Sequence, residues 1–392
     1  MDNKITIALE INSRDLQKEI GNILKNVADV SVKQWEDGVG EKGQAATDVQ
    51  PDIILVEDDP GFGPIKNRVQ ALTRNYPQAV VFVVSPDPRP EHIVEAMKSG
   101  AREYLVSPIK KPVLENAVDE VRSSLSEAGK MGRGRIYSFI GSKGGLGTTF
   151  LAVNTAVAMA ENHKTAVSMV DMSCQSGDSA VLLDLNPGAG FADLAKNFHR
   201  LDLSLLRGTL KKHSSGIEYL GAPVQPKMCE DIKPEHVRKA LELLEKMSNQ
   251  IVVDCSSMFV NDTAVESFKK SEKVFIVTEL TIPSIRNAVR LINVMEDVGI
   301  EKKRIGIVVN RFEKSYSLSI EEAEKSFKKK VFWLFPNDHQ DVMTSINRGV
   351  PLVHFLPHCQ LSTNITSFAE RLVEPAKIDN FRGARGMFGQ AL

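Results

Sequence analysis

The feature that most constrains this sequence is a glycine-rich segment, SKGGLGTT, at residues 142–149. An apolar run of strand length precedes it at residues 136–140, and an apolar run of helix length, FLAVNTAVAMA, follows at residues 150–160. Glycines allow backbone N–H groups to turn around phosphate oxygens, and the positive end of the following helix faces the same anion. The pattern therefore predicts a phosphate-binding loop between a strand and a helix. The alternative is a tight turn that binds nothing.

The loop departs twice from the usual pattern G-x-x-x-x-G-K-[ST]. Ser142 takes the place of the first glycine, and Thr148 takes the place of the lysine. Lys143, near the start, is the only lysine within the loop. Thr149, on the expected first helical turn, is placed to ligate Mg²⁺. The sequence thus keeps the glycines that would surround a phosphate, but its lysine stands near the start of the loop instead of directly before Thr149.

Short apolar runs alternate with helical patterns along the 392 residues, which favours α/β units with mostly parallel sheets covered by helices. The segment EAGKMGRGR, at residues 127–135, has three glycines and no apolar periodicity, and we expect it to link two domains. The expected boundaries are 1–126, 127–135, 136–373 and a tail at 374–392. Strands are expected at residues 5–9, 53–56, 80–84 and 103–106, with one poorly marked strand between residues 25 and 53, and then at 136–140, 166–170, 179–183, 216–220, 250–254, 273–278, 304–310 and 331–334.

Composition excludes several classes of protein. Hydrophobic residues make up 42% of the chain and charged residues 25%, and the net charge of −1 argues against coating nucleic acid through bulk positive charge. No run of about 18 apolar residues exists, and the N-terminus lacks a signal-peptide core, so a cytoplasmic protein is expected. The four cysteines form no C-x-x-C pair, so we expect reduced thiols at Cys174, Cys229, Cys255 and Cys359.

The K-G-G-x-G motif with an early lysine resembles the MinD/ParA family of deviant Walker A ATPases. In that family the early lysine reaches across an ATP-sandwiched dimer to the partner's phosphates, and Lys143 is the matching residue. The pair Thr148-Thr149 in place of Lys-Thr is similar to one branch, the TadZ/CpaE proteins of tight-adherence (Flp, type IVc) pilus systems. The resemblance implies ATP and Mg²⁺ as cofactors, with a homodimer formed through ATP.

Later segments follow the same branch in order. The strand QIVVD ends in Asp254, which resembles a Walker B aspartate that orients Mg²⁺, and TELTIPSIRNA at residues 278–288 resembles T-E-x-x-x-P-S-x-R-N-A. Asn310 and Arg311 match a strand-end pair in which the asparagine contacts adenine. The segments FPND at 335–338 and INRGVP at 346–351 resemble the L-P-N-D…A-I-N-x-G-x-P stretch, with a polar turn as the alternative interpretation.

The first switch segment departs from the family. Relatives carry D-x-D where this chain has Asp171-Met172-Ser173, so the acid that helps position the attacking water is missing. Asp178, in the branch's Q-x-G-D motif, is a candidate substitute, and a helix or turn cap is the alternative. With Thr148 also replacing a cation, we expect nucleotide binding with slow or negligible hydrolysis.

The first unit resembles a flavodoxin-like response-regulator receiver domain that has lost its chemistry. The first strand ends in one acid, Glu10, and Glu57 occupies the phospho-acceptor position. Ser85 keeps the hydroxyl, but Ser107 replaces the lysine before Pro108. The acids Asp58 and Asp59 next to Glu57 leave that alignment open by one residue. We expect a pseudo-receiver used for docking or dimerisation.

The resemblance covers nearly the whole chain and implies a localisation or assembly factor of a pilus secretion system. Its partners would be the secretion ATPase and inner-membrane platform components, which would recruit it to the inner membrane or cell pole. The alternatives are a MinD/ParA-like positioning ATPase acting on DNA or membrane, and a phospho-signalling regulator. The expected catalytic residues are Lys143, Asp171 and Asp178, and the expected nucleotide-binding residues are Lys143, Gly144, Gly145, Leu146, Gly147, Thr148, Thr149, Asp254, Asn310, Arg311, Pro336, Asn337 and Asp338, with Thr149 and Asp254 also at the metal.

Overall fold

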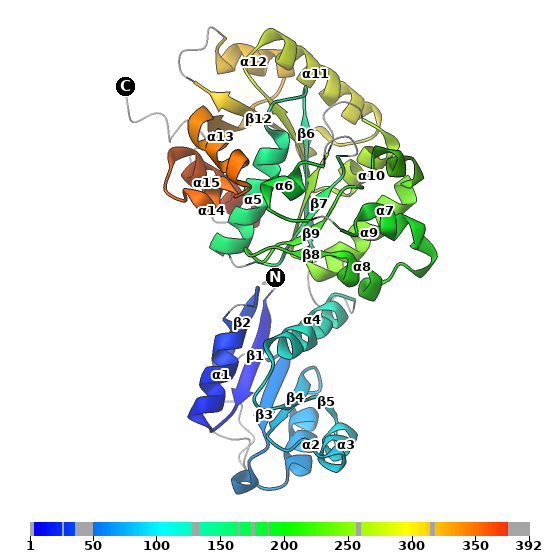
Figure 1. The fold of residues 1–392 in the computed structure, drawn as a ribbon, viewed down its shortest axis with the longest axis vertical. Helices are drawn as coiled ribbons and strands as arrows, with labels where there is room; N and C mark the ends of the chain where they lie inside the picture. Colours follow the sequence, from blue (N-terminus) through cyan, green and yellow to red (C-terminus); the bar gives the residue numbers. More distant parts are fainter. Residues whose placement is uncertain are drawn as a thin grey trace. The chain divides into compact units, whose positions relative to one another are not determined.

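The computed structural model describes residues 4–25, 27–35, 50–127, 133–163, 165–173, 177–186, 188–223, 225–255, 260–313 and 318–374 (Figure 1). The chain divides into two compact units, Met1–Arg133 and Gly134–Leu392. Most of the expected linker and nearly all of the expected tail lie outside the described residues. Among the described helices, none is both long and apolar enough to cross a membrane.

The first unit is built on a five-stranded sheet with the order β2-β1-β3-β4-β5, and every neighbouring pair is parallel. This is the flavodoxin-like, doubly wound order. The poorly marked strand is β2, whose half-exposed sequence VSVKQ lies at the sheet edge. The strands are β1 (Ile5–Glu10), β2 (Val30–Gln34), β3 (Ile53–Glu57), β4 (Val80–Ser85) and β5 (Ala101–Val106), and the helices are α1 (Arg14–Leu24), α2 (Ile65–Asn75), α3 (Pro90–Lys98) and α4 (Lys111–Glu127), with a 3₁₀ turn at Pro60–Phe62.

Two hydrophobic clusters cover the two faces of this sheet. Ile53 and Leu55 pack with α1 and α4, whereas Ile54 and Val56 pack with α2 and α3. Successive strand residues point to opposite faces, so a strand covered on both sides needs a continuous apolar run. This explains why the IILV run of β3 shows no alternation.

The second unit is built on an eight-stranded sheet with the order β13-β12-β11-β6-β10-β7-β9-β8. All neighbouring pairs are parallel except β8 and β9, which are antiparallel. The strands are β6 (Arg135–Gly141), β7 (Val167–Asp171), β8 (Lys211–Lys212), β9 (Glu218–Leu220), β10 (Gln250–Asp254), β11 (Lys273–Thr278), β12 (Ile305–Phe312) and β13 (Val331–Pro336). The helices are α5 (Thr148–His163), α6 (Ser179–Leu182), α7 (Phe191–Lys196), α8 (Leu203–Thr209), α9 (Pro234–Met247), α10 (Asp262–Lys270), α11 (Ile282–Asp297), α12 (Ile320–Phe327), α13 (His339–Arg348), α14 (Leu352–Phe355) and α15 (Gln360–Val373), with 3₁₀ turns at Phe198–Arg200, Pro226–Asp231 and Lys302–Arg304.

Helix α5 is apolar nearly all round because protein surrounds it. Every residue from Phe150 to Met159 is buried. A helix without a polar face belongs inside a core. Its polar residue Asn154 is satisfied within the fold, donating to the carbonyl of Phe150 at 2.9 Å and accepting from the backbone N–H of Val353 at 3.1 Å. The apolar run that predicted a helix therefore also places it at the centre of the unit.

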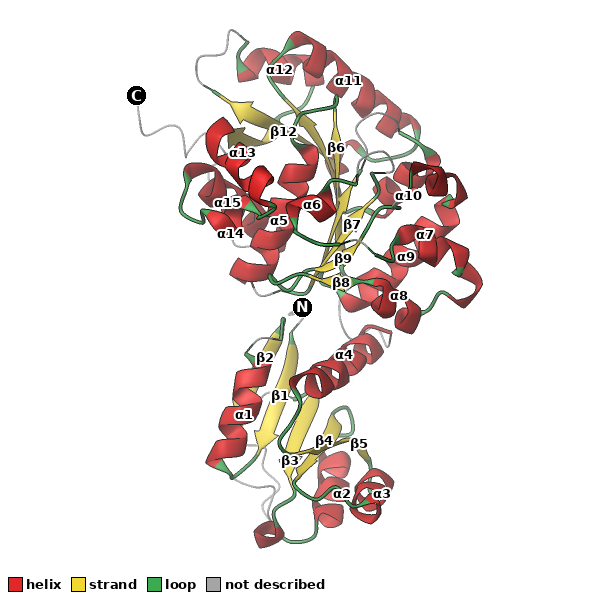
Figure 2. Cartoon of the chain, in the orientation of Figure 1, coloured by secondary structure: helices red, strands yellow, loops and turns green. Residues whose placement is uncertain are grey.

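One expected strand is wrong. Residues 179–183 were expected to be a strand, but α6 is a single helical turn there (Figure 2). A short apolar run fits either state by periodicity alone. Both sides of β7 are already paired, with β10 and β9, so the sheet has no free edge beside it. Ala180 and Leu182 are buried instead in the cluster that contains α5, while Val181 is 63% exposed.

The expectation of four reduced thiols is also wrong. Cys229 is disulfide-bonded. Cys255 and Cys359 are free thiols, and Cys174 lies outside the described residues. Spacing along the chain does not report which cysteines meet in space, so the absence of a C-x-x-C pair was weak evidence.

The first strand of the second unit is tied to its last described helix. The Tyr137 hydroxyl donates to the carbonyl of Leu372 at 2.9 Å. The Arg135 guanidinium donates to the carbonyls of Leu372 at 3.1 Å and Val373 at 3.4 Å. The place where the chain enters this unit therefore adjoins the end of α15.

Candidate functional site

The glycine-rich loop joins an interior strand to the central helix. Strand β6 lies between β11 and β10, and the loop follows its carboxyl end. The backbone N–H of Ser142 donates to the carbonyl of Val277 at 2.8 Å, and its hydroxyl donates to that of Thr278 at 3.2 Å. Gly145 and Gly147 both have φ of 78°, which L residues rarely adopt. The predicted strand, loop and helix are confirmed here.

Asn310 and Arg311 hold the loop from the end of β12. Asn310 Nδ2 donates to the carbonyl of Leu146 at 2.8 Å, and the Arg311 guanidinium donates to the carbonyl of Gly145 at 2.9 Å. The Asn310 side-chain oxygen accepts from the backbone N–H of Arg311 at 2.9 Å, where the chain has a positive φ of 54°. This asparagine is thus a loop tether in the structure, and its contact with adenine stays a prediction.

Lys143 forms an ion pair with a residue that the sequence did not single out as part of the site. Its Nζ lies 2.6 Å from Oε1 of Glu279, immediately after β11. Partial burial alone would raise the pKa of Glu279, but the hydrogen bond and charge of Lys143 outweigh burial and lower it. The loop's cation is therefore paired within its own chain.

Two carboxylates end neighbouring strands beside the loop. Asp171 of β7 and Asp254 of β10 are opposite each other in the parallel register, and both are fully buried. Asp171 accepts from the backbone N–H of Ser173 at 2.8 Å and from the hydroxyls of Ser179 and Tyr219. Burial raises the pKa of Asp171 to about 6, against the opposing effect of these hydrogen bonds.

Asp254 has no such support. Neither carboxylate oxygen has a hydrogen-bond partner of good geometry among the described residues. Burial and then the charge of Asp171 raise the pKa of Asp254 well above its ordinary value, and the hydroxyl of Thr149 opposes this rise. A buried carboxylate with free oxygens, beside a second carboxylate and a hydroxyl, suits a hard divalent cation. The residues present therefore fit Mg²⁺.

The remaining switch residues are placed around this pair. Thr148 is buried at the start of α5, and Ser173 is buried at the position where the resemblance implies the second switch acid. Asp178 is exposed, directly precedes α6 and makes no side-chain capping hydrogen bond. Its charge is close enough to contribute to the raised pKa of Asp254. The capping alternative for this side chain is therefore not what the structure shows.

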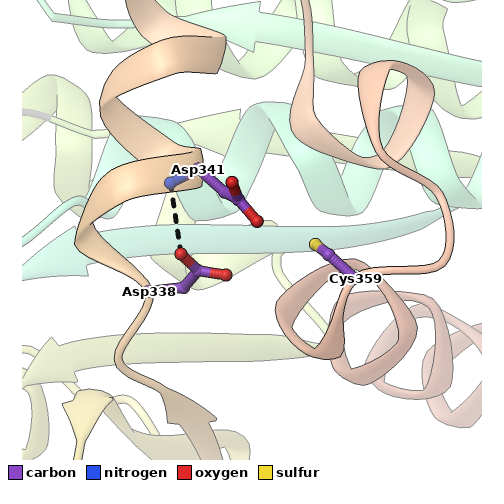
Figure 3. Close-up of side chains that lie close together, drawn as sticks. All are labelled: Asp338, Asp341 and Cys359. Carbon is purple, nitrogen blue, oxygen red and sulfur yellow. Dashed lines mark hydrogen bonds between the residues drawn. The ribbon is translucent and has the colours of Figure 1, made fainter.

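The expected purine side lies at the end of β13. Pro336 is buried as the last residue of that strand, and the exposed Asn337 contacts the carboxylate of Glu313. Asp338 caps α13 by accepting from the backbone N–H of Asp341 at 3.2 Å. Its carboxylate also lies close to the carboxylate of Asp341 and the thiol of Cys359. One oxygen of each carboxylate and the Cys359 sulfur all lie within 4.8 Å of one another (Figure 3). The polar-turn interpretation thus describes Asp338, and a purine contact stays a prediction.

The partners of Lys143 and Asp171 were missed at the sequence level for different reasons. Glu279 lies in a segment that the resemblance had already marked, so its acidic character beside a lone lysine was an available signal. Ser179 was assigned to a strand, and Tyr219 reaches Asp171 only because β9 pairs with β7. Pairing between distant strands leaves no local signal.

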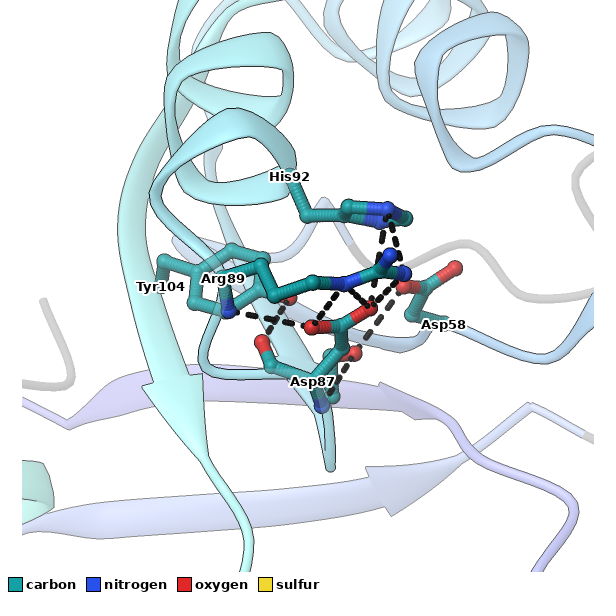
Figure 4. Close-up of polar contacts among 6 residues, drawn as sticks. Asp58, Asp87, Arg89, His92 and Tyr104 are labelled. Carbon is teal, nitrogen blue, oxygen red and sulfur yellow. Dashed lines mark hydrogen bonds and ion pairs between the residues drawn. The ribbon is translucent and has the colours of Figure 1, made fainter.

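The first unit has its own polar cluster where its strands end. Asp58 accepts from the Ser85 hydroxyl at 3.0 Å, whereas the Glu57 carboxylate accepts from the backbone N–H groups of Asn12 at 2.8 Å and Ser13 at 2.9 Å. The charged group of Asp87, Arg89 and His92 adjoins Asp58, with Tyr104 bonded to the backbone of Asp87 (Figure 4). Hydrogen bonds from Arg89 lower the pKa of Asp87 below its usual range.

Glu10, the single acid after β1, is already paired. An Arg68 nitrogen lies 3.0 Å from Glu10 Oε1, with both side chains nearly buried. The same guanidinium donates to the carbonyl of Glu57 at 2.7 Å. An arginine thus supplies positive charge at this acid.

Known proteins resemble the second unit. A family model described as the CobQ/CobB/MinD/ParA nucleotide binding domain matches residues 137–357. The septum site-determining protein MinD of Thermotoga maritima is 22% identical over 245 residues, covering 61% of this chain and 88% of that protein. An uncharacterised ATP-binding protein of Methanocaldococcus jannaschii is 24% identical over 233 residues, covering 59% of this chain and 84% of that protein.

Solved structures agree in fold. A ParA family ATPase from Chlorobium tepidum has a TM-score of 0.57 at 25% identity, covering 60% of this chain and 98% of that chain. MinD from Pyrococcus horikoshii, described as complexed with Mg-ADP, has a TM-score of 0.54 at 20% identity, covering 62% of this chain and 98% of that chain. The family model matches more than half of the chain, over the strands and loop that build the site. The chain belongs to the CobQ/CobB/MinD/ParA nucleotide-binding domain family.

Proposed function

We propose that this protein is an ATP-binding localisation or assembly factor of a tight-adherence pilus secretion system, similar to TadZ/CpaE proteins. In this proposal two copies bind face to face through ATP, and the nucleotide acts as a dimer switch. The observation that carries it is Lys143 at the mouth of a loop whose usual lysine position holds Thr148. The pilus assignment rests on the order of motifs in the sequence.

Different groups of the site would bind the phosphates and the Mg²⁺ of Mg·ATP. The backbone N–H groups of residues 144–149 and the N-terminal end of α5 would hold the phosphates. Thr149 and Asp254 would hold Mg²⁺, which supplies positive charge beside the phosphates when bound. Asp171 is oriented by Ser173, Ser179 and Tyr219 at the position of the first switch acid. The Mg-ADP complex of the Pyrococcus horikoshii relative supports this choice of ligand.

Slow turnover follows from what is missing around the phosphates. Ser173 gives a neutral side chain where the resemblance expects a water-positioning acid, and the candidate substitute Asp178 is exposed. Losing one electrostatic group of this kind typically costs about 10²–10³ in rate. Binding rather than fast hydrolysis is therefore the proposed activity.

Light scattering after size exclusion tests the dimer. Wild type is expected to double from its monomer mass of 43.3 kDa when Mg·ATP is added. Lys143→Ala is expected to stay monomeric while still binding ATP, because the variant keeps the loop N–H groups but loses the cation for the partner's phosphates. Lys303→Ala is the matched control, since that lysine is 78% exposed and paired with Glu301. A Lys143→Ala protein that still dimerises with ATP contradicts the proposal.

A second candidate is a positioning ATPase that acts on DNA or membrane, since MinD and ParA proteins are among the relatives. The sequence offers one short basic run, KSFKKK at residues 325–330, as a candidate DNA-binding face, but two of its lysines make local contacts. Lys330 pairs with Glu324 at 2.7 Å, and Lys329 donates to the carbonyl of Lys302 at 2.6 Å. Pelleting with DNA or liposomes in Mg·ATP separates the candidates, since strong retention on DNA supports the second.

We propose that the first unit is a pseudo-receiver domain used for docking or dimerisation, joined by the linker at 127–135 to the nucleotide-binding domain. Its flavodoxin-like strand order supports a receiver fold, and the Arg68–Glu10 ion pair supports the loss of metal-dependent chemistry. The proposed location is the cytoplasm, with recruitment to the inner membrane or cell pole by pilus components.

Acetyl phosphate tests the pseudo-receiver. The full chain with Mg²⁺ is expected to take up no stoichiometric label. Arg68 pairs with Glu10, the acid after β1, and position 107 holds a serine in place of the lysine. Intact-mass spectrometry measures the label. Stoichiometric phosphorylation that disappears in Asp58→Asn would show that a working receiver remains.

A further inference from the structure

The register of the central sheet brings Lys143 and Glu279 together. Gly141 at the end of β6 lies opposite Val277 of β11. Lys143 and Glu279 each follow this pair by two residues, so both leave the sheet at the same level from neighbouring strands. Their 2.6 Å contact is therefore built into the strand pairing.

The glutamate is held more firmly than the lysine. The hydroxyls of Thr281 and Ser284, at the start of α11, donate to Glu279 Oε1 at 3.2 and 3.4 Å. The Glu279 side chain is 14% exposed, whereas that of Lys143 is 39% exposed. Hydrogen bonds from the start of α11 position the carboxylate, and the more exposed Lys143 is the partner better placed to leave the pair.

This carboxylate adjoins the mouth of a phosphate site. Besides Lys143, the nearby charge of Arg311 also lowers the pKa of Glu279, so the side chain is ionised at neutral pH. Arg311 itself contacts the loop at Gly145. A fixed negative charge here attracts the same cations that a polyphosphate attracts, and it repels the polyphosphate.

We infer that Glu279 is a positioning residue that retains Lys143 within its own subunit until the phosphates of ATP replace the carboxylate as the partner of Nζ. The inference rests on the proposed ATP-bridged dimer and adds its regulation. Without nucleotide, Lys143 is neutralised in cis and unavailable to a second copy. With Mg·ATP bound to both copies, Lys143 leaves the Glu279 carboxylate and binds phosphate oxygens of the second copy's ATP across the dimer interface.

Zero-length coupling with a carbodiimide reads out the cis pair directly. The reagent joins Lys143 Nζ to the Glu279 carboxyl as an amide and takes up the water released, and peptide mass spectrometry of the full-length protein measures the yield. Mg²⁺ with a non-hydrolysable ATP analogue is expected to lower this yield about tenfold. The Lys270–Glu242 pair, with Nζ and Oε1 2.9 Å apart, is the internal control and should couple equally in both conditions. An unchanged Lys143–Glu279 yield at saturating analogue overturns the inference.

Glu279→Gln provides an independent variant test. Removing the competing charge is expected to lower the ATP concentration at the midpoint of dimerisation about tenfold, the size of one charged hydrogen bond. Glu301→Gln is the matched control, because it breaks an exposed Lys303 ion pair of 2.7 Å on the same unit and should leave the midpoint unchanged. A weaker or unchanged dimer in folded Glu279→Gln, verified by its thermal transition, overturns the inference.

The two proposals fail in different ways. If wild type never dimerises with Mg·ATP, the proposed dimer is wrong, and the coupling yield still decides whether nucleotide releases Lys143. If wild type dimerises through Lys143 and Glu279→Gln does not tighten it, the dimer stands and the retaining role of Glu279 is wrong.

Discussion

Replacing Asp254 by asparagine is expected to stabilise the nucleotide-free protein and abolish its response to Mg·ATP. The carboxylate is fully buried, adjoins Asp171 and lacks a hydrogen-bond partner of good geometry among the described residues. Asparagine keeps the shape and removes the buried charge, which should increase the free energy of unfolding by ~2 kcal/mol and Tm by roughly 5 °C. The same substitution removes the carboxylate proposed to orient Mg²⁺. Thermal unfolding with and without Mg·ATP measures both effects.

The gain from Asp254→Asn should depend on pH in a defined direction. Burial raises the pKa of Asp171 to about 6 and that of Asp254 well above its ordinary value. The native state therefore binds more protons than the unfolded chain above pH ~4, and wild-type stability falls as pH rises toward neutrality. The difference between Asp254→Asn and wild type should accordingly be smaller at pH 5 than at pH 7.5.

Asp231→Asn is the control, because that aspartate is exposed on the same unit. It should change neither Tm nor the stabilisation by Mg·ATP. A destabilised Asp254→Asn protein would mean that the wild-type carboxylate is satisfied without metal, and a retained response to Mg·ATP would place Mg²⁺ on other ligands.

Gly147→Ala is expected to damage the phosphate loop far more than Gly145→Ala. Both glycines have φ of 78°, where an L side chain costs about 1–2 kcal/mol. A Cβ at Gly145 would meet nothing within 4 Å, whereas one at Gly147 would lie 2.8 Å from Asn310 Nδ2. That nitrogen donates to the carbonyl of Leu146, so the clash also breaks a loop tether. Denaturant unfolding should show a loss of about 1 kcal/mol for Gly145→Ala and about 3 kcal/mol for Gly147→Ala.

A double variant identifies the cause of the larger loss. If Asn310 is what the new methyl group meets, the combination Gly147→Ala with Asn310→Ala should be less destabilised than the two single variants added together. Full additivity would show that backbone strain alone accounts for Gly147→Ala. Equal losses for Gly145→Ala and Gly147→Ala would contradict the contact with Asn310 altogether.

The parts of the site that sequence could predict are those built from adjacent residues. Strand β6, the loop and α5 form one continuous pattern, and Asp254 simply ends an apolar strand, so local rules found both. What could not be predicted depends on distant pairing. The Tyr219 and Ser179 contacts of Asp171 arise from β9 beside β7 and from a turn of helix whose apolar run resembled a strand.

The roles of residues outside the loop also depend on contacts between distant segments, which the sequence does not show. Asn310 was expected at adenine on resemblance, and the structure shows the additional task of tethering the loop. Asp338 was expected beside the purine, and it caps α13. In both cases an amide or carboxylate can serve a ligand or the backbone, and only the folded neighbourhood shows which backbone groups are within reach.

The hydrogen bonds from Arg135 and Tyr137 to the end of α15 hold the first and last described segments of the second unit side by side. Because these two ends are neighbours, they could be joined and the chain opened elsewhere without moving the helices and strands. A circular permutant that joins these points and opens the chain at an exposed loop on another side would keep every strand neighbour of the sheet. In evolutionary terms, such a unit can be inserted into or appended to other proteins with little rearrangement of its phosphate site.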